Sequence, residues 1–181
     1  MNARIICASL CAVVALAACA QNSGTDAAGT GSGSREAGAT LRDAEGRVRA
    51  EARATQDGEG VKIRLTATQM TPGAYGAHVH TTGRCDAPDF ASAGPHWNPT
   101  AQQHGKDNPQ GAHKGDLPNL LVGTDGRGTV EFTIPSASLQ GGDVSILDAD
   151  GAAVMIHASA DDYRTDPSGN SGARIACGVL G

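Results

Sequence analysis

Aromatic side chains are scarce in this chain of 181 residues: they make up 3%, and 25 residues are glycine. A helical bundle or long coiled coil requires repeated large apolar residues with few glycines, so this composition argues against both. Basic residues are also few, since 14 Lys and Arg face 19 Asp and Glu for a net charge of −5. Without a basic cluster to displace counterions from phosphates, nucleic acid is not expected as a partner. The length suits one domain.

No apolar run is long enough to cross a membrane as a helix. The longest lies at residues 5–18 after Arg4, whereas a membrane span needs about 20 residues. A positive start, an apolar stretch and small residues before Cys19 are typical of an export signal. The end of the segment is similar to a bacterial lipoprotein signal. We therefore expect a signal at 1–18 and a lipid anchor at Cys19; an ordinary secretory signal cut nearby is the alternative.

The segment that follows contains few large apolar residues. Residues 19–37 are dominated by Gly, Ser, Thr and Ala, which cannot bury enough surface to offset their ordering entropy. We expect a lipidated cysteine and flexible tether at 19–37 and one folded domain at 38–181. The expected location is the bacterial cell envelope, with the anchored protein facing the periplasm.

Cysteine usage agrees with export. Of the five cysteines, Cys7 and Cys11 would leave with the signal and Cys19 would carry lipid. Cys85 and Cys177 remain as an even pair, and in an oxidising compartment we expect them to form a disulfide. Two free buried thiols are the alternative.

Apolar and polar residues alternate with a period of two along several segments, which predicts strands with one buried face. Turn signals such as Asp57-Gly58 and Asp125-Gly126 separate them. About eight short strands joined by tight turns favour an all-β antiparallel sandwich or barrel. The segments expected to be strands include 48–54, 61–67, 74–80, 129–134, 152–157 and 174–179.

A long segment without periodicity, residues 81–119, interrupts this pattern and contains five of the eight prolines. Such a loop in a compact domain is either a mistaken assignment or functional. It carries three histidines and Asp116, and bound metal could supply the order that apolar residues do not. A second, short polar loop is expected at 158–173.

Five of the six histidines lie in the first loop or in the expected strand just before it, and the sixth, His157, ends the expected strand 152–157. His78 and His80 are two residues apart on an expected strand and so point to one face. His157 ends an apolar run, where a lone histidine is more often a core residue than a ligand. Four imidazoles suit copper, and three with a carboxylate suit tetrahedral zinc. The candidate copper set is His78, His80, His96 and His157; the candidate zinc set is His96, His104, His113 and Asp116.

Four motifs together resemble the copper–zinc superoxide dismutase family, because ligand types, order and spacing agree. The resemblance covers about 38–181 and implies an eight-stranded antiparallel Greek-key β-barrel with a long metal-binding loop. Trp97 stands where the family commonly has Phe or Tyr, and loop 158–173 is shorter than in many members. The matching motifs lie at 76–80, 93–99, 113–119 and 169–179.

The resemblance also implies roles for single residues. His96 would bridge one copper and one zinc ion per subunit and act in catalysis. Arg174 would guide the substrate, and Asp161 would hydrogen-bond one copper-ligand and one zinc-ligand histidine. Cys85 and Cys177 match the family's disulfide.

The implied activity is dismutation of superoxide to dioxygen and hydrogen peroxide by a copper centre that is alternately reduced and reoxidised, with zinc structural. Two alternatives use the same ligands: a lipoprotein that stores copper and zinc, and an inactive barrel for structure or copper delivery. A zinc hydrolase is disfavoured, because the sequence contains no His-Glu-x-x-His motif. Family members occur as monomers and dimers, so both a monomer and a homodimer remain open.

Overall fold

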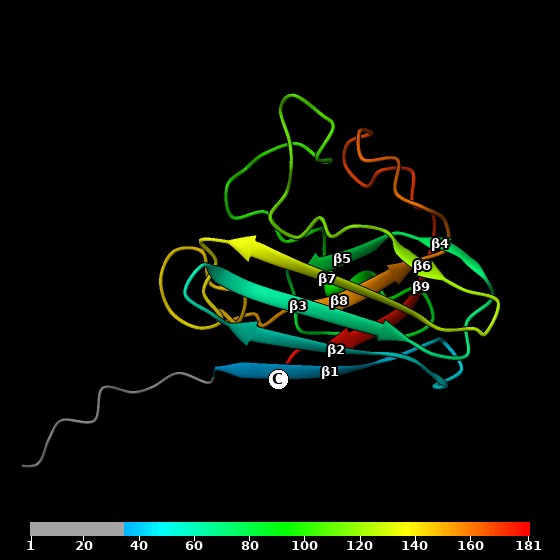
Figure 1. Ribbon diagram of the computed structural model, residues 1–181. Coiled ribbons are helices and arrows are strands. Elements are labelled where there is room, and N and C mark those ends of the chain that lie inside the picture. Colours follow the sequence, from blue (N-terminus) through cyan, green and yellow to red (C-terminus); the bar gives the residue numbers. More distant parts are fainter. Residues whose placement is uncertain (1–34) are drawn as a thin grey trace, which may run out of the picture. The chain divides into compact units, whose positions relative to one another are not determined.

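The computed structural model describes residues 35–181 (Figure 1), which fold as an all-β domain with one short 3-10 turn. The predicted signal at 1–18 and the anchor at Cys19 lie outside the described residues. Within 35–181, no helix is long and apolar enough to cross a membrane. The elements are β1 (Glu36–Arg42), β2 (Val48–Gln56), β3 (Gly60–Ala67), β4 (Gly73–Tyr75), β5 (Ala77–His80), η1 (Ala91–Ala93), β6 (Leu120–Val122), β7 (Gly128–Pro135), β8 (Ala153–His157) and β9 (Arg174–Val179).

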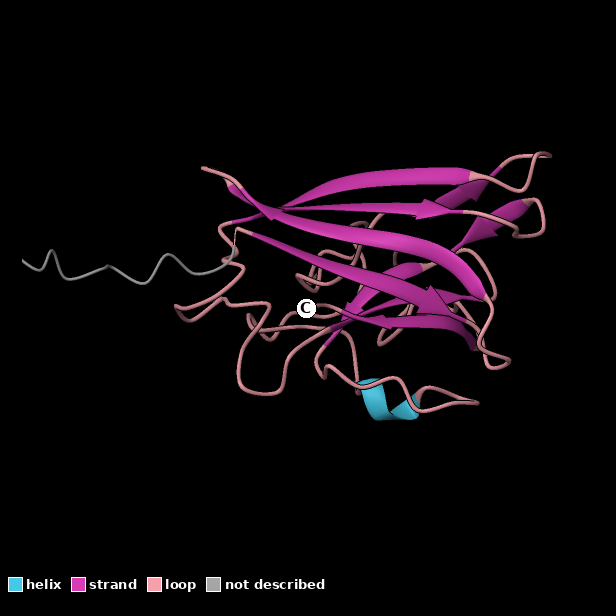
Figure 2. Ribbon diagram, turned by 90° about the horizontal axis from the view of Figure 1, so that it is seen from below, coloured by secondary structure: helices cyan, strands magenta, loops and turns pink. Residues whose placement is uncertain are grey.

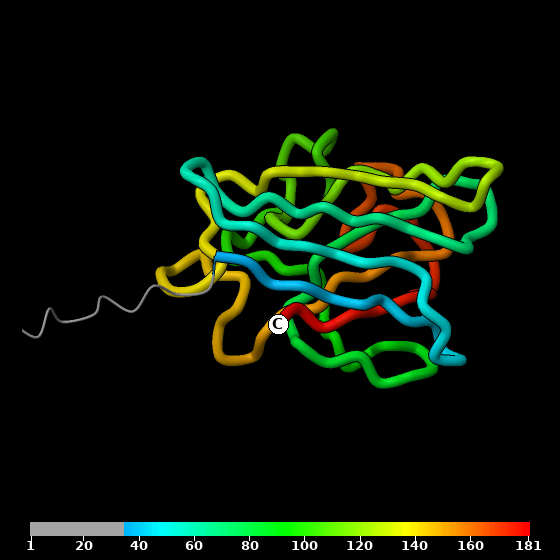
Figure 3. The backbone as a smooth tube through the Cα atoms, turned by 60° about the horizontal axis from the view of Figure 1, so that its bottom comes forward, coloured from blue at the N-terminus to red at the C-terminus, as the bar shows by residue number. Residues whose placement is uncertain are grey.

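Seven strands form one antiparallel sheet in the order β5-β8-β9-β1-β2-β3-β7, and β4 pairs with β6 in a second, two-stranded sheet. The large sheet curls, so that its two halves face each other as layers (Figure 2). The last strand returns to the first: Arg42 of β1 lies opposite Cys177 of β9, and the two strands run side by side (Figure 3). The sheet edges are β5 and β7.

The strands form where alternation places small and branched apolar residues on one face. In β1, every second residue is buried, and the same pattern holds through β2 and most of β3. Leu41, Ile63 and Leu65 are among the largest fully buried side chains. Burying a side chain of this size stabilises the fold by roughly 1.5–3 kcal/mol. The all-β antiparallel prediction is confirmed.

The strand count is nine, one more than the expected number. The expected strand at 74–80 is two strands, β4 and β5, with Gly76 between them. A Cβ at Gly76 would lie 2.8 Å from the Ser171 Cβ, so the backbone passes too close to its neighbour for a side chain. Strands β1 and β6 were not expected, because β1 buries mainly alanines and β6 has only three residues. Both depend on their tertiary partners more than on local propensity.

Loops 81–119 and 158–173 lie close to each other at one side of the sheet (Figure 1). The backbone N–H of Asp107 donates to the Tyr163 carbonyl at 3.0 Å, and the His104 N–H donates to Asp166 Oδ1 at 2.6 Å. Loop 81–119 also has a small core of its own, in which Phe90 and Ala93 pack with Met155 and Cys177. The long loop is therefore an ordered part of the domain.

Candidate metal centre

All six histidines of the chain are buried and gather beside β5. His78 and His80 lie on β5, and His157 ends the neighbouring strand β8. The loop is paired along the other side of β5 through two isolated bridges, His80 with His96 and His78 with Asp116. These bridges bring residues far apart in the sequence to one place.

The first cluster contains the four histidines of the candidate copper set, whose donor atoms lie within 4.8 Å of one another. In three of the rings, one nitrogen is held from outside the cluster. The His80 Nδ1 is 2.8 Å from the Gly94 carbonyl, and the His157 Nδ1 is 3.2 Å from the Gly172 carbonyl. The His78 Nε2 is 2.8 Å from Asp161 Oδ2. The second nitrogen of each ring is left facing the cluster.

The second cluster is organised by the Asp116 carboxylate. Its Oδ1 lies 3.0 Å from the Nδ1 of His96, 3.1 Å from that of His104 and 3.2 Å from that of His113. Its Oδ2 accepts the backbone N–H of Gly105 at 2.9 Å and that of His113 at 3.0 Å. Three imidazole nitrogens therefore meet around one carboxylate oxygen.

The donors that all lie within 4.8 Å of one another in this region are those of His78, His96, His104 and Asp116. His78 thus takes the place of His113 in this grouping by distance. The Nε2 of His78 is already bonded to Asp161, however, and His113 touches Asp116 directly. We therefore keep His96, His104, His113 and Asp116 as the candidate zinc set.

Asp161 connects the two clusters. Its Oδ2 bonds His78 and its Oδ1 bonds the His104 Nε2 at 3.0 Å, which is the pairing that the sequence resemblance implies. Gly169, at φ +62°, lies directly against this carboxylate. A Cβ at Gly169 would collide with Asp161 Oδ1 and lie 2.6 Å from the His104 Nε2, so only glycine fits there.

Four buried ring nitrogens in the described part of the chain form no hydrogen bond of good geometry: His78 Nδ1, His80 Nε2, His104 Nδ1 and His157 Nε2. Of these, His104 Nδ1 has a charged neighbour, the Asp116 Oδ1 at 3.1 Å. An unsatisfied buried polar group costs about 1–3 kcal/mol. All four belong to the two clusters. Their lone pairs converge, and a bound metal ion would accept them. The all-nitrogen cluster suits copper, and the cluster of three imidazoles and a carboxylate suits zinc. The residues therefore fit both metals.

The protonation states of His80, His157 and Asp116 agree with metal binding. Burial lowers the pKa of His80 to about 2 and that of His157 to about 3, so both rings stay neutral at ordinary pH. Burial would lower the pKa of His104 as well, but the neighbouring carboxylates of Asp116 and Asp161 outweigh it and raise that pKa to about 9. His104 would therefore release a proton when it binds metal. Burial opposes ionisation of Asp116, yet bonds from the three histidines hold its pKa far below the usual value. The neutral imidazole and the ionised carboxylate are the forms that bind metal.

Arg174, the candidate guiding residue, lies next to the first cluster. Its two terminal nitrogens donate to the carbonyls of Phe90 and Gly94, each at 2.7 Å. The same Gly94 carbonyl accepts from His80, so one backbone oxygen fixes both the arginine and the ring. Partial burial lowers the pKa of Arg174, but a guanidinium remains charged.

Cys85 and Cys177 form the expected disulfide, with a Cα–Cα distance of 5.7 Å. The bond links loop 81–119 to β9, the strand that begins with Arg174. It therefore holds the Phe90 and Gly94 carbonyls close to the arginine that they orient. The disulfide prediction is confirmed.

Sequence reasoning missed several residues that shape the site. The carbonyls of Gly94 and Gly172 orient ring nitrogens, but backbone oxygens leave no signal in residue type. Asn119 exchanges two hydrogen bonds with Asp161, one through each polar atom of its amide. The Tyr163 N–H donates to Asp161 Oδ1 at 2.6 Å. Asn119 ends the motif at 113–119, one of the four that carry the family resemblance, and this is the one signal that could have found it.

The chain matches the family model described as "Copper/zinc superoxide dismutase (SODC)" over residues 44–180. It is 52% identical over 126 residues to the "Superoxide dismutase-like protein YojM" of Bacillus subtilis (strain 168). That match covers 68% of this chain and 64% of the relative. It is 41% identical over 145 residues to "Superoxide dismutase [Cu-Zn]" of Caulobacter vibrioides, covering 78% of this chain and 83% of that one.

The fold also matches a solved structure. The crystal structure of a SOD-like protein from Bacillus subtilis superposes with a TM-score of 0.75 at 46% sequence identity. The superposition covers 79% of this chain and 97% of that chain. This neighbour supports the Greek-key β-barrel that the sequence resemblance implied.

Proposed function

Because the chain belongs to the copper/zinc superoxide dismutase family, an oxidoreductase family that binds copper and zinc, we propose that it dismutates superoxide to dioxygen and hydrogen peroxide. The observation that carries this proposal is the pair of adjacent clusters with four buried, unpaired ring nitrogens. A hydrogen-bonded core would leave no such nitrogens, since buried polar groups are normally paired.

In this proposal, His78, His80, His96 and His157 hold copper, and His96, His104, His113 and Asp116 hold zinc. When bound, copper supplies reversible one-electron chemistry, and zinc supplies a fixed positive charge without redox chemistry. His96 belongs to both sets. Its Nδ1 faces Asp116 at 3.0 Å, which leaves its Nε2 for the first cluster and supports a bridging role.

The residues of the chain contribute binding, orientation and proton handling. Arg174 attracts the superoxide anion and holds it beside His80, because its guanidinium is charged and fixed by two carbonyls. When it is not bound to copper, the His96 Nε2 would hold one of the two protons that hydrogen peroxide requires, and solvent would supply the other. Asp161 keeps His78 and His104 in one tautomer and one orientation.

Attraction of the substrate is local in this proposal. The chain carries a net charge of −5, so the protein as a whole repels an anion. A single arginine at the mouth of the cluster can still concentrate the field there. Loop 158–173 lacks a Lys/Glu-rich stretch, so Arg174 would supply most of the steering.

We further infer a membrane-anchored lipoprotein of the bacterial cell envelope, facing the periplasm, with lipid on Cys19. The support is the N-terminal pattern of the sequence and the disulfide, which is typical of an oxidising compartment. Mass spectrometry of the mature protein tests this, since a diacylglycerol on an N-terminal Cys19 is the expected result. A Cys19→Ser variant that stays in the membrane fraction would contradict the anchor.

The test of activity is superoxide decay by pulse radiolysis on the purified protein loaded with copper and zinc. We expect decay close to the diffusion limit that disappears when copper is removed and zinc is kept. Decay no faster than in buffer, with both metals bound, would replace the proposal by metal storage or an inactive barrel. Native mass spectrometry of the same sample decides between monomer and homodimer.

A further inference from the structure

An apolar pocket that the proposed reaction does not use lies behind the second cluster, at the edge strand β7. We name it the edge pocket. Its volume is about 450 Å³, within the range of small-molecule sites of roughly 300–1,000 Å³. Its lining residues include Lys106, Lys114, Asp116, Leu117, Phe132 and Tyr163.

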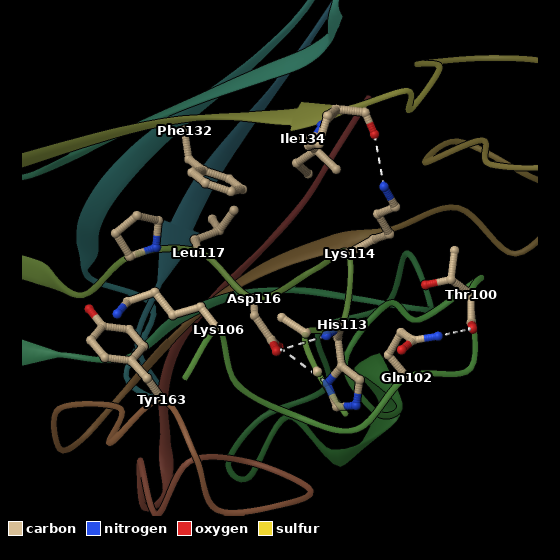
Figure 4. Close-up of a pocket in the computed structure, with 14 residues that line it drawn as sticks. Thr100, Gln102, Lys106, His113, Lys114, Asp116, Leu117, Phe132, Ile134 and Tyr163 are labelled. Atoms are coloured by element: carbon tan, nitrogen blue, oxygen red, sulfur yellow. Dashed lines mark hydrogen bonds and ion pairs between the residues drawn. The ribbon is translucent and has the colours of Figure 1, made fainter. Parts of the chain in front are cut away.

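The edge pocket exists because the large sheet does not close. Strand β7 is one edge of that sheet, and the segment 111–118 of the long loop lies across it. Phe132 and Ile134 point into the pocket from β7, and Leu117 faces them from the loop (Figure 4). Tyr163 of the second loop completes the wall. The body of the pocket is therefore apolar and is built from three separate segments.

The charged groups around this apolar body are mainly positive. The Lys114 Nζ donates to the Pro135 carbonyl at 2.9 Å and lies at the end of the pocket next to Ile134 (Figure 4). Within residues 35–181 Lys114 has no ion pair, so its charge lacks a counter-charge. The Lys106 Nζ lies 4.3 Å from the centre of the Tyr163 ring. Its ion pair with Asp107 is exposed and hence weak.

The one carboxylate that lines the edge pocket belongs to the second cluster and is not available to a ligand in the pocket. Asp116 accepts bonds from ring nitrogens and from two backbone N–H groups, which occupy both of its oxygens. A ligand with an apolar body and an anionic head therefore complements the pocket better than a neutral or cationic one.

We propose that the edge pocket binds a small monocarboxylate with an apolar body, of the class of medium-chain fatty acids, with its carboxylate at Lys114. The alkyl chain lies along the partly exposed apolar wall of the pocket, against Phe132, Pro118 and Tyr163. Lys106 adds a second, weaker attraction at the rim. Binding is independent of dismutation, so its test stands whether or not the protein consumes superoxide.

The first experiment is a calorimetric titration of the protein loaded with copper and zinc, using acetate, butanoate, hexanoate and octanoate. Burial of each methylene contributes about 0.8 kcal/mol, so we expect affinity to rise about threefold to fourfold per methylene. Equal affinity for acetate and octanoate would place the carboxylate on a metal and overturn the proposal. Octan-1-ol, which has the apolar body without the charge, should bind more weakly than octanoate; equal binding would also overturn it.

The second experiment is the Lys114→Gln variant, which removes the charge and keeps a polar side chain of similar length. We expect octanoate to bind about twofold to fivefold more weakly, as for a partly exposed ion pair. The matched control is Lys62→Gln. Lys62 is exposed on β3 and pairs with Thr133, whose side chain points to the opposite sheet face from Phe132. An equal loss in both variants would reduce the effect to net charge and overturn the site.

The third experiment locates the ligand by amide chemical shifts in the diamagnetic form with cuprous copper and zinc. We expect octanoate to shift residues 112–118 and 132–135 most. Shifts confined to β5 and β8 would place the ligand at the first cluster instead and contradict the proposal.

Discussion

Strands β1, β2 and β3 and loops 81–119 and 158–173 are stabilised in different ways. The strands bury Leu41, Ile63 and Leu65 completely and pair their backbones along a continuous ladder. The loops are held instead by hydrogen bonds to two carboxylates, Asp116 and Asp161, and by the ring nitrogens around them. Strands β1, β2 and β3 contain no buried side-chain nitrogen or oxygen without a hydrogen bond, whereas such nitrogens gather where β5 and β8 meet the loops: His78, His80 and His157 lie on those strands and His104 lies in loop 81–119.

This difference indicates how the two regions depend on metal. A buried polar group without a partner opposes folding, so the metal centre, which β5, β8 and the loops build together, carries an unfavourable contribution that bound metal would remove. The sheet carries none of the four unpaired nitrogens on β1, β2, β3 or β7. We therefore expect β1, β2, β3 and β7 to fold without metal, and β5, β8 and the loops to depend on it.

The largest expected effect is a loss of activity when a ligand of the metal centre is replaced. Replacing His80 by Ala removes a ligand, and since loss of an outer partner of a ligand costs about 10–100-fold, we expect superoxide decay to slow by at least about a thousandfold. Copper content by mass spectrometry should fall in parallel.

The contrasting variant is Leu65→Ala, which should lower the free energy of unfolding by about 2–5 kcal/mol while the folded protein keeps copper and activity. Ile63→Val, expected to cost about 1 kcal/mol, serves if Leu65→Ala does not fold. Retention of copper by the His80→Ala variant, or loss of it from folded Leu65→Ala, would break the comparison.

The disulfide joins the two regions, since Cys85 lies in the long loop and Cys177 in β9. It closes a loop with a sequence separation of 92, for which the chain-entropy relation gives up to about 4.6 kcal/mol. We expect the double variant Cys85→Ser and Cys177→Ser to unfold at lower urea concentration by a corresponding amount. An unchanged midpoint would mean that the loop is fixed by its other contacts alone.

Metal removal should loosen the loops selectively. The amides of Gly105 and His113 donate to Asp116, and that of Tyr163 donates to Asp161. Without metal, nothing would hold the ring nitrogens in place around the two carboxylates, and these hydrogen bonds would open more often. We therefore expect hydrogen exchange at these amides to accelerate about a hundredfold. Amides paired between β2 and β3 are the internal control and should change less than about twofold. Equal acceleration in both regions would show that the domain depends on metal as a whole.

Replacing Arg174 by Ile tests whether the loop region steers the substrate. We expect superoxide decay at low salt to slow by about tenfold and to lose most of its salt dependence. The control is Arg53→Ile, because the exposed Arg53 of β2 pairs with Glu36 of β1, away from the metal centre. An unchanged rate in the Arg174→Ile variant at low salt would falsify the steering role.

The smallest expected effect concerns a polar contact in the sheet region. Burial opposes ionisation of Asp43 at the β1–β2 turn, but bonds from Arg47 and Arg49 lower its pKa from 3.8 to about 2. A folded-state pKa below the unfolded value means that the stabilisation is complete above about pH 4 and is lost as the pH falls toward 2. The difference in unfolding free energy between the wild type and Asp43→Asn should therefore shrink over this range. A constant difference between pH 6 and 2 would contradict this account.

Alternation predicted most of the sheet because a half-buried strand needs a period of two. It found β2, β3, β7, β8 and β9 and joined β4 to β5. It could not find β6 or β1, since three residues, or a row of alanines, carry little periodic signal. Their places follow from pairing with β4 and β2.

The donor set was also readable in the sequence. The alternation of side chains along a strand places His78 and His80 on one face. Three of the other histidines lie together in loop 81–119, and His157 ends a second expected strand. The family resemblance added Asp161 and Arg174. The structure brings all of these residues together, while their roles toward bound metal remain predictions for the experiments above.

The sequence by itself determined the side-chain chemistry: six histidines, two well-placed carboxylates, a cysteine pair and an alternating pattern that forms a sheet. Only the tertiary structure decided which nitrogen of each ring faces the cluster, because that choice belongs to the carbonyls of Gly94 and Gly172 and to Asp161. It also created the edge pocket, where three distant segments meet beside an unpaired strand edge. Residue types fix what a group can bind, whereas its direction and its neighbours are set by backbone atoms that every residue shares.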